Sequence, residues 1–163
     1  MYGVAVITLS DTASKGERID ESGRILCEIV EKSGYKVTYK IIIPDDSDTL
    51  TKLLCDLADN DKADLILTTG GTGFSQRDNT PEATMNAIER SAMGISEAIR
   101  YRSLQITPRA MLSRGVSGIR KNAIIINMPG SPKAVRECLE YIIGAVTHGL
   151  DILKGNAVNC ATK

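Results

Sequence analysis

The chain has 163 residues, and its 20 basic and 20 acidic side chains give a formal net charge of zero. A chain of this length is expected to fold as one domain over residues 1–163 and to bury about 70% of the surface it exposes when unfolded, without a disulfide or a metal. The balanced charge argues against nucleic-acid and membrane partners, because both attract strongly basic proteins.

The cysteines, the histidine and the apolar runs exclude further classes of protein. The four cysteines stand far apart, at positions 27, 55, 138 and 160, and form no C-x-x-C motif, so we expect reduced, mostly buried thiols and no zinc site. His148, the only histidine, lies late in an apolar segment, which favours a packing role over catalysis. No run approaches the roughly 20 apolar residues that cross a bilayer, and no basic flank marks a signal peptide. We therefore expect a cytoplasmic protein.

The chain begins with a strand, a polar segment and a helix. Tyr2–Leu9 is a β-branched run typical of a central strand, and the polar residues 10–18 predict a loop. Asp20 is placed to cap a helix that would stop at Gly34. Ligands of open parallel sheets bind at the carboxyl ends of the strands, so the loop is either part of a site or a solvated connection.

A second strand and helix follow. Tyr35–Ile43 predicts a strand, and Asp48–Asn60 has the apolar periodicity of a helix. Either Asp46 or Ser47 would cap that helix. Asp45 is then left without a structural role, which makes it a candidate for the site.

The segment Thr68–Thr84, TTGGTGFSQRDNTPEAT, carries the strongest pattern in the chain. An apolar run ends in two threonines, as a buried parallel strand does, and three glycines follow within four residues. Thr80 and Pro81 predict a helix start, with Thr80 as the N-cap. A strand, a glycine turn and a helix N-terminus form an anion site, and a plain tight turn is the alternative.

The second half continues the alternation. Pro81–Ala92 and Ile95–Leu104 have helical patterns interrupted at Gly94, Gly115–Ile119 predicts a weak strand, and Asn122–Met128 predicts a strong buried one. Strands alternating with helices predict a three-layer α/β/α sandwich with a mostly parallel central sheet.

A second strand-loop-helix anion site follows the last predicted strand. Ser131 is a good N-cap, and Pro132 is a good first residue for a final helix that runs to about His148. Lys133 lies in the first turn, where a cation opposes the helix dipole. A bound anion explains this lysine better than helix stability does.

The predicted strand ends combine phosphate-binding turns with two carboxylates. Because the second and third strands would end at one edge of the sheet, Asp45 is expected to approach Asp78. Carboxylates repel a phosphate unless a divalent cation lies between them, and Mg²⁺ is the usual choice. Arg77 and Lys133 would add positive charge. This chemistry suits nucleotidyl transfer, whereas the lack of G-x-x-x-x-G-K-[ST] and G-x-G-x-x-G disfavours a Walker A NTPase and a dinucleotide dehydrogenase.

The central motif, together with Ser10-Asp11-Thr12, Pro44-Asp45 and MPGSPKAV at residues 128–135, resembles the MogA/MoaB family of molybdenum cofactor biosynthesis proteins, which is related to the gephyrin G domain. The resemblance covers nearly the whole chain. It implies a molybdopterin adenylyltransferase that uses Mg-ATP and molybdopterin and releases pyrophosphate. It also implies a homotrimer that passes its product to a molybdate-inserting, MoeA-like partner.

The resemblance implies roles for particular residues. Asp45 and Asp78 match the essential pair, as catalytic residues and Mg²⁺ ligands, with the division of roles between them open. The two turns would hold the nucleotide, and the first loop would line the molybdopterin side. These residues are Gly70, Gly71, Thr72, Gly73, Gly130, Ser131 and Pro132 for ATP, and Ser10, Asp11 and Thr12 for molybdopterin.

Two departures from the family pattern keep other hypotheses open. Asn79 stands where the family commonly has an aliphatic residue, and the chain has the shorter MoaB length. Some MoaB members are inactive, so a molybdopterin-binding carrier or scaffold is the alternative. The presence of both Asp45 and Asp78 favours the enzyme. Generic nucleotide binding is a third hypothesis, under which Asp11 and Thr12 contribute nothing to ligand binding.

Overall fold

The computed structural model describes residues 1–156, so Cys160 lies outside the described residues. Six strands form one mixed sheet in the order β2-β1-β3-β6-β5-β4. Their bounds are β1 Gly3–Leu9, β2 Lys36–Ile43, β3 Leu65–Thr69, β4 Arg90–Ser91, β5 Ser117–Arg120 and β6 Ala123–Met128. The four strands β2, β1, β3 and β6 are parallel, and β5 is antiparallel to both of its neighbours. The prediction of a mostly parallel sheet is confirmed.

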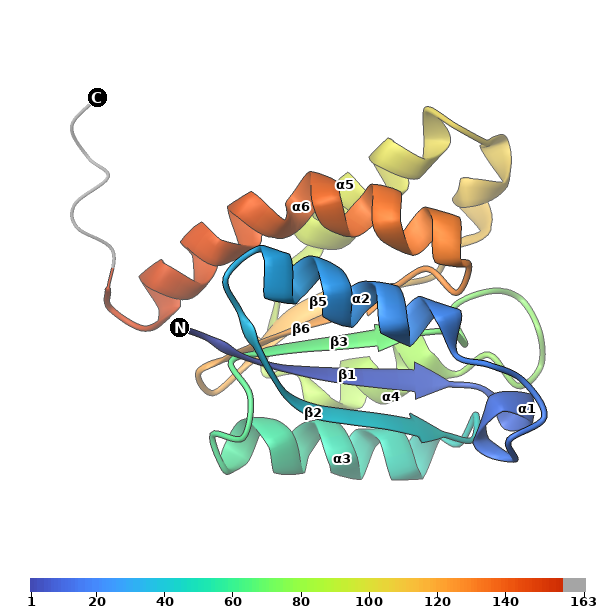
Figure 1. Ribbon diagram of the computed structural model, residues 1–163, viewed down its shortest axis with the longest axis horizontal. Helices are drawn as coiled ribbons and strands as arrows, with labels where there is room; N and C mark the ends of the chain where they lie inside the picture. Colours follow the sequence, from blue (N-terminus) through green and yellow to red (C-terminus); the bar gives the residue numbers. More distant parts are fainter. Residues whose placement is uncertain (157–163) are drawn as a thin grey trace.

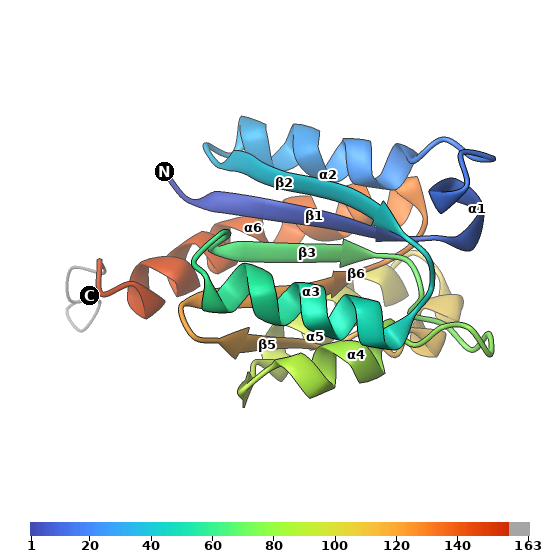
Figure 2. The ribbon, with the colours of Figure 1, turned by 90° about the horizontal axis from the view of Figure 1, so that it is seen from below.

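Helices cover both faces of the sheet (Figures 1 and 2). The helices are α1 Asp11–Ser14, α2 Glu21–Lys32, α3 Ser47–Asp59, α4 Thr80–Ala87, α5 Met93–Leu104, the 3-10 helix η1 Pro108–Leu112 and α6 Pro132–Leu153. One hydrophobic core lies between the sheet and helices α2, α5 and α6, and a second lies between the sheet and helices α3 and α4. Strands β3 and β6 are buried at every position because both faces are covered. The three-layer prediction is therefore confirmed.

The strand order creates a switch point between β1 and β3. Chain connections run from β1 to β2 on one side and continue to β3 and β6 on the other. Parallel pairing aligns Thr8 with Thr69 and Thr69 with Met128, so the three strands end at one edge. That edge is at the right-hand end of the sheet in Figure 1, where α1 lies. Open α/β sheets bind ligands at such a place.

Several predicted boundaries are wrong, each for a tertiary reason. The polar segment 10–18 contains the one-turn helix α1, because the Ser10 hydroxyl caps it by accepting from Ala13 N at 3.1 Å. The helix predicted to reach residue 92 ends at Ala87, since residues 89–92 bond to strand β5. The last helix continues beyond His148 to Leu153, because its apolar face extends to the buried residue 150.

The cysteines within residues 1–156 are free thiols, as predicted from their spacing in the sequence. Cys27 and Cys55 are half-buried and Cys138 is buried, and all three are free thiols in α2, α3 and α6. Across residues 1–156, every helix is too short or too polar to cross a membrane.

Candidate functional site

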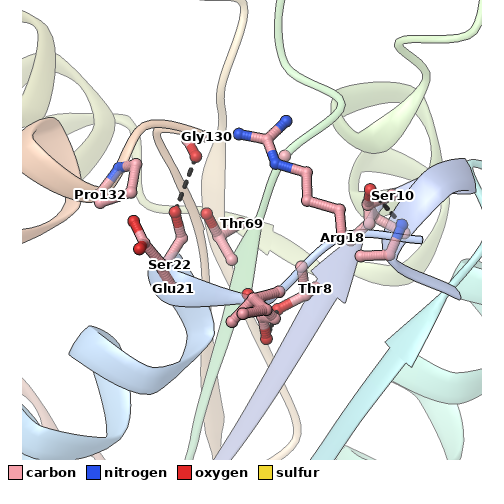
Figure 3. A pocket seen from close by; sticks show the side chains of 13 residues that line it. Thr8, Ser10, Arg18, Glu21, Ser22, Thr69, Gly130 and Pro132 are labelled. Carbon is pink, nitrogen blue, oxygen red and sulfur yellow. Dashed lines mark hydrogen bonds between the residues drawn. The ribbon is translucent and has the colours of Figure 1, made fainter. Parts of the chain in front are cut away.

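A polar cavity of about 530 Å³ lies at the carboxyl ends of β1, β3 and β6, beside the N-terminus of α2 (Figure 3). Its size is in the usual range for small-molecule sites, roughly 300–1,000 Å³. Four residues predicted from the sequence line it, namely Ser10, Gly70, Gly130 and Pro132. Ser10 thus shares one cavity with residues of the two turns. The other lining residues are Thr8, Leu9, Ala13, Arg18, Ile19, Asp20, Glu21, Ser22 and Thr69.

Hydroxyl groups hold the turn after β6 against this cavity. The Ser22 hydroxyl donates to the Gly130 carbonyl at 2.8 Å, and the Thr69 hydroxyl donates to the Pro129 carbonyl at 2.6 Å. A Cβ on Gly130 would lie 3.6 Å from the Cα of Gly70, so the two turns lie back to back. Ser131 caps α6 by accepting from Ala134 N, as the sequence predicts.

The backbone conformation and the packing of the turn after β3 require glycine at two of its positions. Gly70 has φ of +96°, and a Cβ there would lie 2.3 Å from the Leu9 carbonyl oxygen. Gly71 has φ of +66°, and its Cβ would lie 2.4 Å from Thr80 Oγ1. The predicted capping role of Thr80 is wrong, because its buried hydroxyl donates back to the Gly70 carbonyl at 3.0 Å and Asn79 occupies the N-cap position. Chain packing alone therefore requires the first two glycines.

Asp45 and Asp78 contact the same turn at its other residues. A Cβ on Gly71 would lie 3.2 Å from Asp45 Oδ1, and a Cβ on Gly73 would lie 2.9 Å from Asp78 Oδ2. Neither carboxylate lines the 530 Å³ cavity. Burial raises the pKa of Asp45, and the negative charges of Asp11 and Asp78 raise it further. Two carboxylates 33 positions apart in sequence thus face one glycine turn.

Asp11 and Arg77 form a bidentate ion pair beside Asp45. Arg77 Nε and Nη2 donate to the two carboxylate oxygens of Asp11 at 2.6 and 2.9 Å, and Nη2 also donates to the Asp45 carbonyl at 3.1 Å. Asp11 N donates to Asp45 Oδ2, and Asp45 N donates to Asp11 Oδ1, both at 3.1 Å. The hydrogen bond from Arg77 lowers the pKa of Asp11. The positive charge expected for a phosphate is therefore directed to an internal partner.

Lys133 also has an internal partner. Its exposed ammonium lies 3.9 Å from Glu137, one helical turn further along α6. Thr12, the third residue of the predicted molybdopterin side, is exposed, and its hydroxyl lies 3.3 Å from that of Ser10. The geometry gives no reason to invoke an anion for Lys133.

A smaller cavity of about 250 Å³ lies on the other side of the Gly130 turn, among α5, η1 and the start of α6. Thr72, Gly130 and Ser131, all predicted from the sequence, line it. Sequence analysis did not single out its other polar residues, Arg100, Ser103, Thr107, Arg109 and Ser113. The polar break before Pro108 is the one local signal that marks this region.

Three arginines missed by residue-level prediction line the cavities, and one of them, Arg100, donates to the Gly115 carbonyl. Arg18 lies in the larger cavity and Arg109 in the smaller one. In Figure 3 the Arg18 side chain points from the Ser10 side toward the side of Gly130. Within residues 1–156, no ion pair engages either guanidinium. Both are therefore available to an anionic ligand.

The carboxylates are suited to a shared metal and not to a metal held by the protein alone. Over the described chain, no group of three or more His, Cys, Asp and Glu side chains could hold an ion. Asp45 and Asp78 offer oxygen ligands at a place where burial, and then the like charge of neighbouring carboxylates, raises the pKa of Asp45. Mg²⁺ commonly takes one or two carboxylates and completes its shell with water and substrate phosphates. The donor set fits that arrangement.

Comparison with known proteins identifies the family. The family described as a probable molybdopterin binding domain matches residues 5–148. The chain belongs to this family. A molybdopterin adenylyltransferase of Helicobacter pylori is 41% identical over 157 residues, which cover 94% of this chain and 88% of that protein. Gephyrin of Dictyostelium discoideum is 39% identical over 160 residues, which cover 92% of this chain and 22% of gephyrin.

Solved structures place the fold in the same family. The crystal structure of the molybdopterin biosynthesis enzyme MoaB from Thermus thermophilus superposes with a TM-score of 0.89 at 40% identity, covering 95% of this chain and 98% of that one. The predicted resemblance to the MogA/MoaB family is confirmed.

Proposed function

We propose that this protein is a molybdopterin adenylyltransferase, which transfers AMP from Mg-ATP to the terminal phosphate of molybdopterin and releases pyrophosphate. The family and the name of its relatives support this function. One geometric observation carries it: Gly70 lines the larger cavity, whereas Gly71 and Gly73, one and three residues later, contact Asp45 and Asp78. A single turn thus joins a ligand cavity to a pair of carboxylates, as nucleotidyl transfer requires.

The residues divide between the two substrates as follows. The turns Gly70–Gly73 and Gly130–Pro132 hold the nucleotide, with Ser10 in the same cavity. The smaller cavity across the Gly130 turn takes part of molybdopterin. Thr12 lies beside Ser10 at the larger cavity and would contact another part of molybdopterin. Arg18 and Arg109 supply positive charge to phosphates on the two sides. Asp11 contributes indirectly, because its carboxylate is committed to Arg77.

The reaction requires positioning and charge compensation and no protein nucleophile. A phosphate oxygen of molybdopterin attacks the α-phosphorus of ATP, and the bond to the bridging oxygen of the β-phosphate breaks as the new bond forms. The electron pair leaves with pyrophosphate. Magnesium bound by Asp45, Asp78 and the ATP phosphates would offset the charge of that leaving group. Backbone N–H groups of the glycine turn bind phosphate oxygens without steric hindrance from side chains.

The deciding experiment follows pyrophosphate release and AMP attached to the pterin, using purified protein, molybdopterin and Mg-ATP. We expect the wild type to form both products in equal amounts. Asp78→Asn is expected to lose turnover while it stays folded and still binds molybdopterin. A wild type that binds molybdopterin tightly without turnover would identify an inactive MoaB-like carrier. Normal turnover by Asp78→Asn would contradict the metal role of this aspartate.

We also propose that the enzyme works in the cytoplasm as a homotrimer and passes its product to a molybdate-inserting, MoeA-like partner. Exposed apolar side chains on α5 and η1 support self-association, since Tyr101, Met111 and Leu112 are 60%, 65% and 47% exposed. Sedimentation equilibrium of the full chain tests the oligomer, and a monomer at micromolar concentration would contradict it.

A further inference from the structure

The loop from Gly73 to Asp78 carries one of the proposed carboxylates, yet most of its residues are exposed. Phe74 is 71% exposed, and residues 75–77 are exposed as well. The bonds within the loop are short in range: Asp78 N donates to the Ser75 carbonyl at 3.0 Å, and Ser75 N donates to Asp78 Oδ2 at 3.1 Å. These bonds shape a turn, and the side chain of Arg77 attaches the middle of the loop to Asp11 and to the Asp45 carbonyl.

One guanidinium joins the two ends of this loop. Arg114 Nε donates to the Gly73 carbonyl at 2.7 Å, and its Nη2 donates to the Asp78 carbonyl at 2.6 Å. Its Nη1 pairs with Glu82 in the first turn of α4, and its backbone N donates to the Thr72 carbonyl at 2.9 Å. Arg114 lies just before β5 and is 36 residues beyond Asp78 in the sequence.

We infer that Arg114 is a positioning residue, which closes the loop from Gly73 to Asp78 and so holds the Asp78 carboxylate against the glycine turn. The closure brings Asp78 Oδ2 to within 2.9 Å of where a Cβ on Gly73 would be. Arginine suits this role because its planar fork presents several donors in a fixed geometry. The ammonium of a lysine is a single point that cannot reproduce the same set of bonds. The inference rests on the proposed function, because it assigns Asp78 a catalytic role.

A second arginine provides a matched control. Arg120 Nε and Nη2 donate to the carboxylate of Asp59 at 2.8 and 2.7 Å, and its Nη1 donates to the Ala87 carbonyl at 2.9 Å. It therefore makes the same kinds of bonds as Arg114, to a carboxylate and to backbone carbonyl oxygens. It lies at the end of β5 and takes no part in the proposed site.

The experiment uses the absence of tryptophan from the chain. Phe74→Trp places a single fluorescent reporter on the exposed loop. Time-resolved anisotropy is measured in this background for Arg114→Gln, Arg114→Lys and Arg120→Gln, together with turnover and thermal unfolding. We expect both Arg114 variants to reduce the restrained component of the anisotropy decay to the part that Arg77 maintains, and Arg120→Gln to keep all of it. For Arg114→Gln we expect kcat to fall about 100-fold, the scale of a misplaced reacting group, while KM for ATP changes less than about threefold.

Each outcome decides one point. Equal anisotropy in Arg114→Gln and Arg120→Gln would overturn the loop closure. A mobile loop with unchanged kcat would overturn the positioning of Asp78. Lysine that restores both signals would overturn the need for the guanidinium fork. A wild type without turnover would reject the proposed function, and the anisotropy comparison would then decide the role of Arg114 in loop closure on its own.

Discussion

Asp45 and Asp78 reach the same glycine turn by different means. Asp45 follows β2 directly, and Asp11 follows β1 at the matching position, since Leu9 pairs with Ile43 in the parallel register. The backbone N–H of each aspartate donates to the carboxylate of the other, and Arg77 donates to the Asp11 carboxylate. Asp78 instead lies in an exposed loop that is joined at its ends by Arg114.

Sheet register thus positions Asp45, whereas the inferred positioning of Asp78 depends on a distant side chain, Arg114. The Asp45 side depends on β1, which is buried at six of its seven positions and resists local opening, and on the edge strand β2, whose last residue Ile43 is buried. The Asp78 side depends on a few charge-assisted bonds at the surface. Substitutions should therefore affect the two sides unequally, although we propose one reaction for both carboxylates.

The largest effect is expected from the carboxylates themselves. Asp45→Asn and Asp78→Asn should each lower kcat by about 1000-fold, the upper scale for loss of one electrostatic element of a site. Burial raises the pKa of Asp45, so its ionised form is disfavoured in the folded state and costs stability at neutral pH. Asp45→Asn should therefore raise Tm while it removes turnover. Product formation and thermal unfolding without ligands check this, and a lower Tm would contradict the electrostatic cost.

The next largest effects are expected at two glycines of one turn, on activity for Gly73 and on stability for Gly71. Gly73→Ala places a Cβ 2.9 Å from Asp78 Oδ2, so the carboxylate must shift. We expect turnover to fall about 100-fold with stability changed by less than about 1 kcal/mol. Gly71→Ala should instead lose about 1–3 kcal/mol of stability, because φ is +66° and the Cβ meets Thr80. Gly94→Ala, with no atom within 4 Å, is the control and should change neither.

A smaller loss is expected when the Asp11–Arg77 pair is broken. Arg77→Gln leaves Asp11 and Asp45 without their local counter-charge, so kcat should fall about tenfold, or 1.4 kcal/mol, as for one bond to a charged group. Arg77→Lys keeps the charge and should lose less. Adding Asp11→Asn to Arg77→Gln should cost little more, since the two side chains act together. Additive losses would show that Asp11 contacts substrate directly.

Local pattern predicted the strands, most helices and the edge where the site lies. The apolar periodicity of residues 20–34 and 47–60 fits a helix and not a strand. The carboxyl ends of parallel strands lie at one edge of the sheet, whichever strands are neighbours. It also predicted that Asp45 would approach Asp78, and both carboxylates lie against one glycine turn. These features depend on neighbours in sequence or on the direction of strands.

What sequence analysis missed depends on contacts between distant residues. Arg77 looked like a phosphate ligand because its partner, Asp11, is 66 residues away. Thr80 had the residue type of an N-cap, yet the turn at Gly70 supplied a better acceptor for its hydroxyl. Arg114 carried no local signal, since its acceptors are carbonyl oxygens that any residue has. Residue type indicates bonding capacity, and only the fold assigns the partner.

The smallest effect is expected at Glu82, the carboxylate partner of Arg114. Comparing Glu82 with Asp11, the partner of Arg77, tests whether the two arginines depend on their carboxylates to the same degree. The hydrogen bond from Arg114 lowers the pKa of Glu82, so the pair stabilises the fold above the ordinary pKa of 4.5 and loses that contribution as the pH falls through the lower, folded-state value. Because Glu82 is exposed, Glu82→Gln should cost about 0.5 kcal/mol at neutral pH, and the cost should vanish in acid. Unfolding from pH 7 to pH 3 measures it, with Glu97→Gln, a substitution at another exposed glutamate, as the control.

The same variant shows which bonds of Arg114 matter for activity. In Glu82→Gln, Arg114 keeps its bonds to the Gly73 and Asp78 carbonyl oxygens, so kcat should stay within about twofold of the wild type. Asp11→Asn, in contrast, removes the carboxylate that orients both Arg77 and Asp45, so it should lower kcat about as much as Arg77→Gln does. If Glu82→Gln lowered kcat as strongly as Asp11→Asn, the ion pair and not the loop closure would be the means by which Arg114 acts.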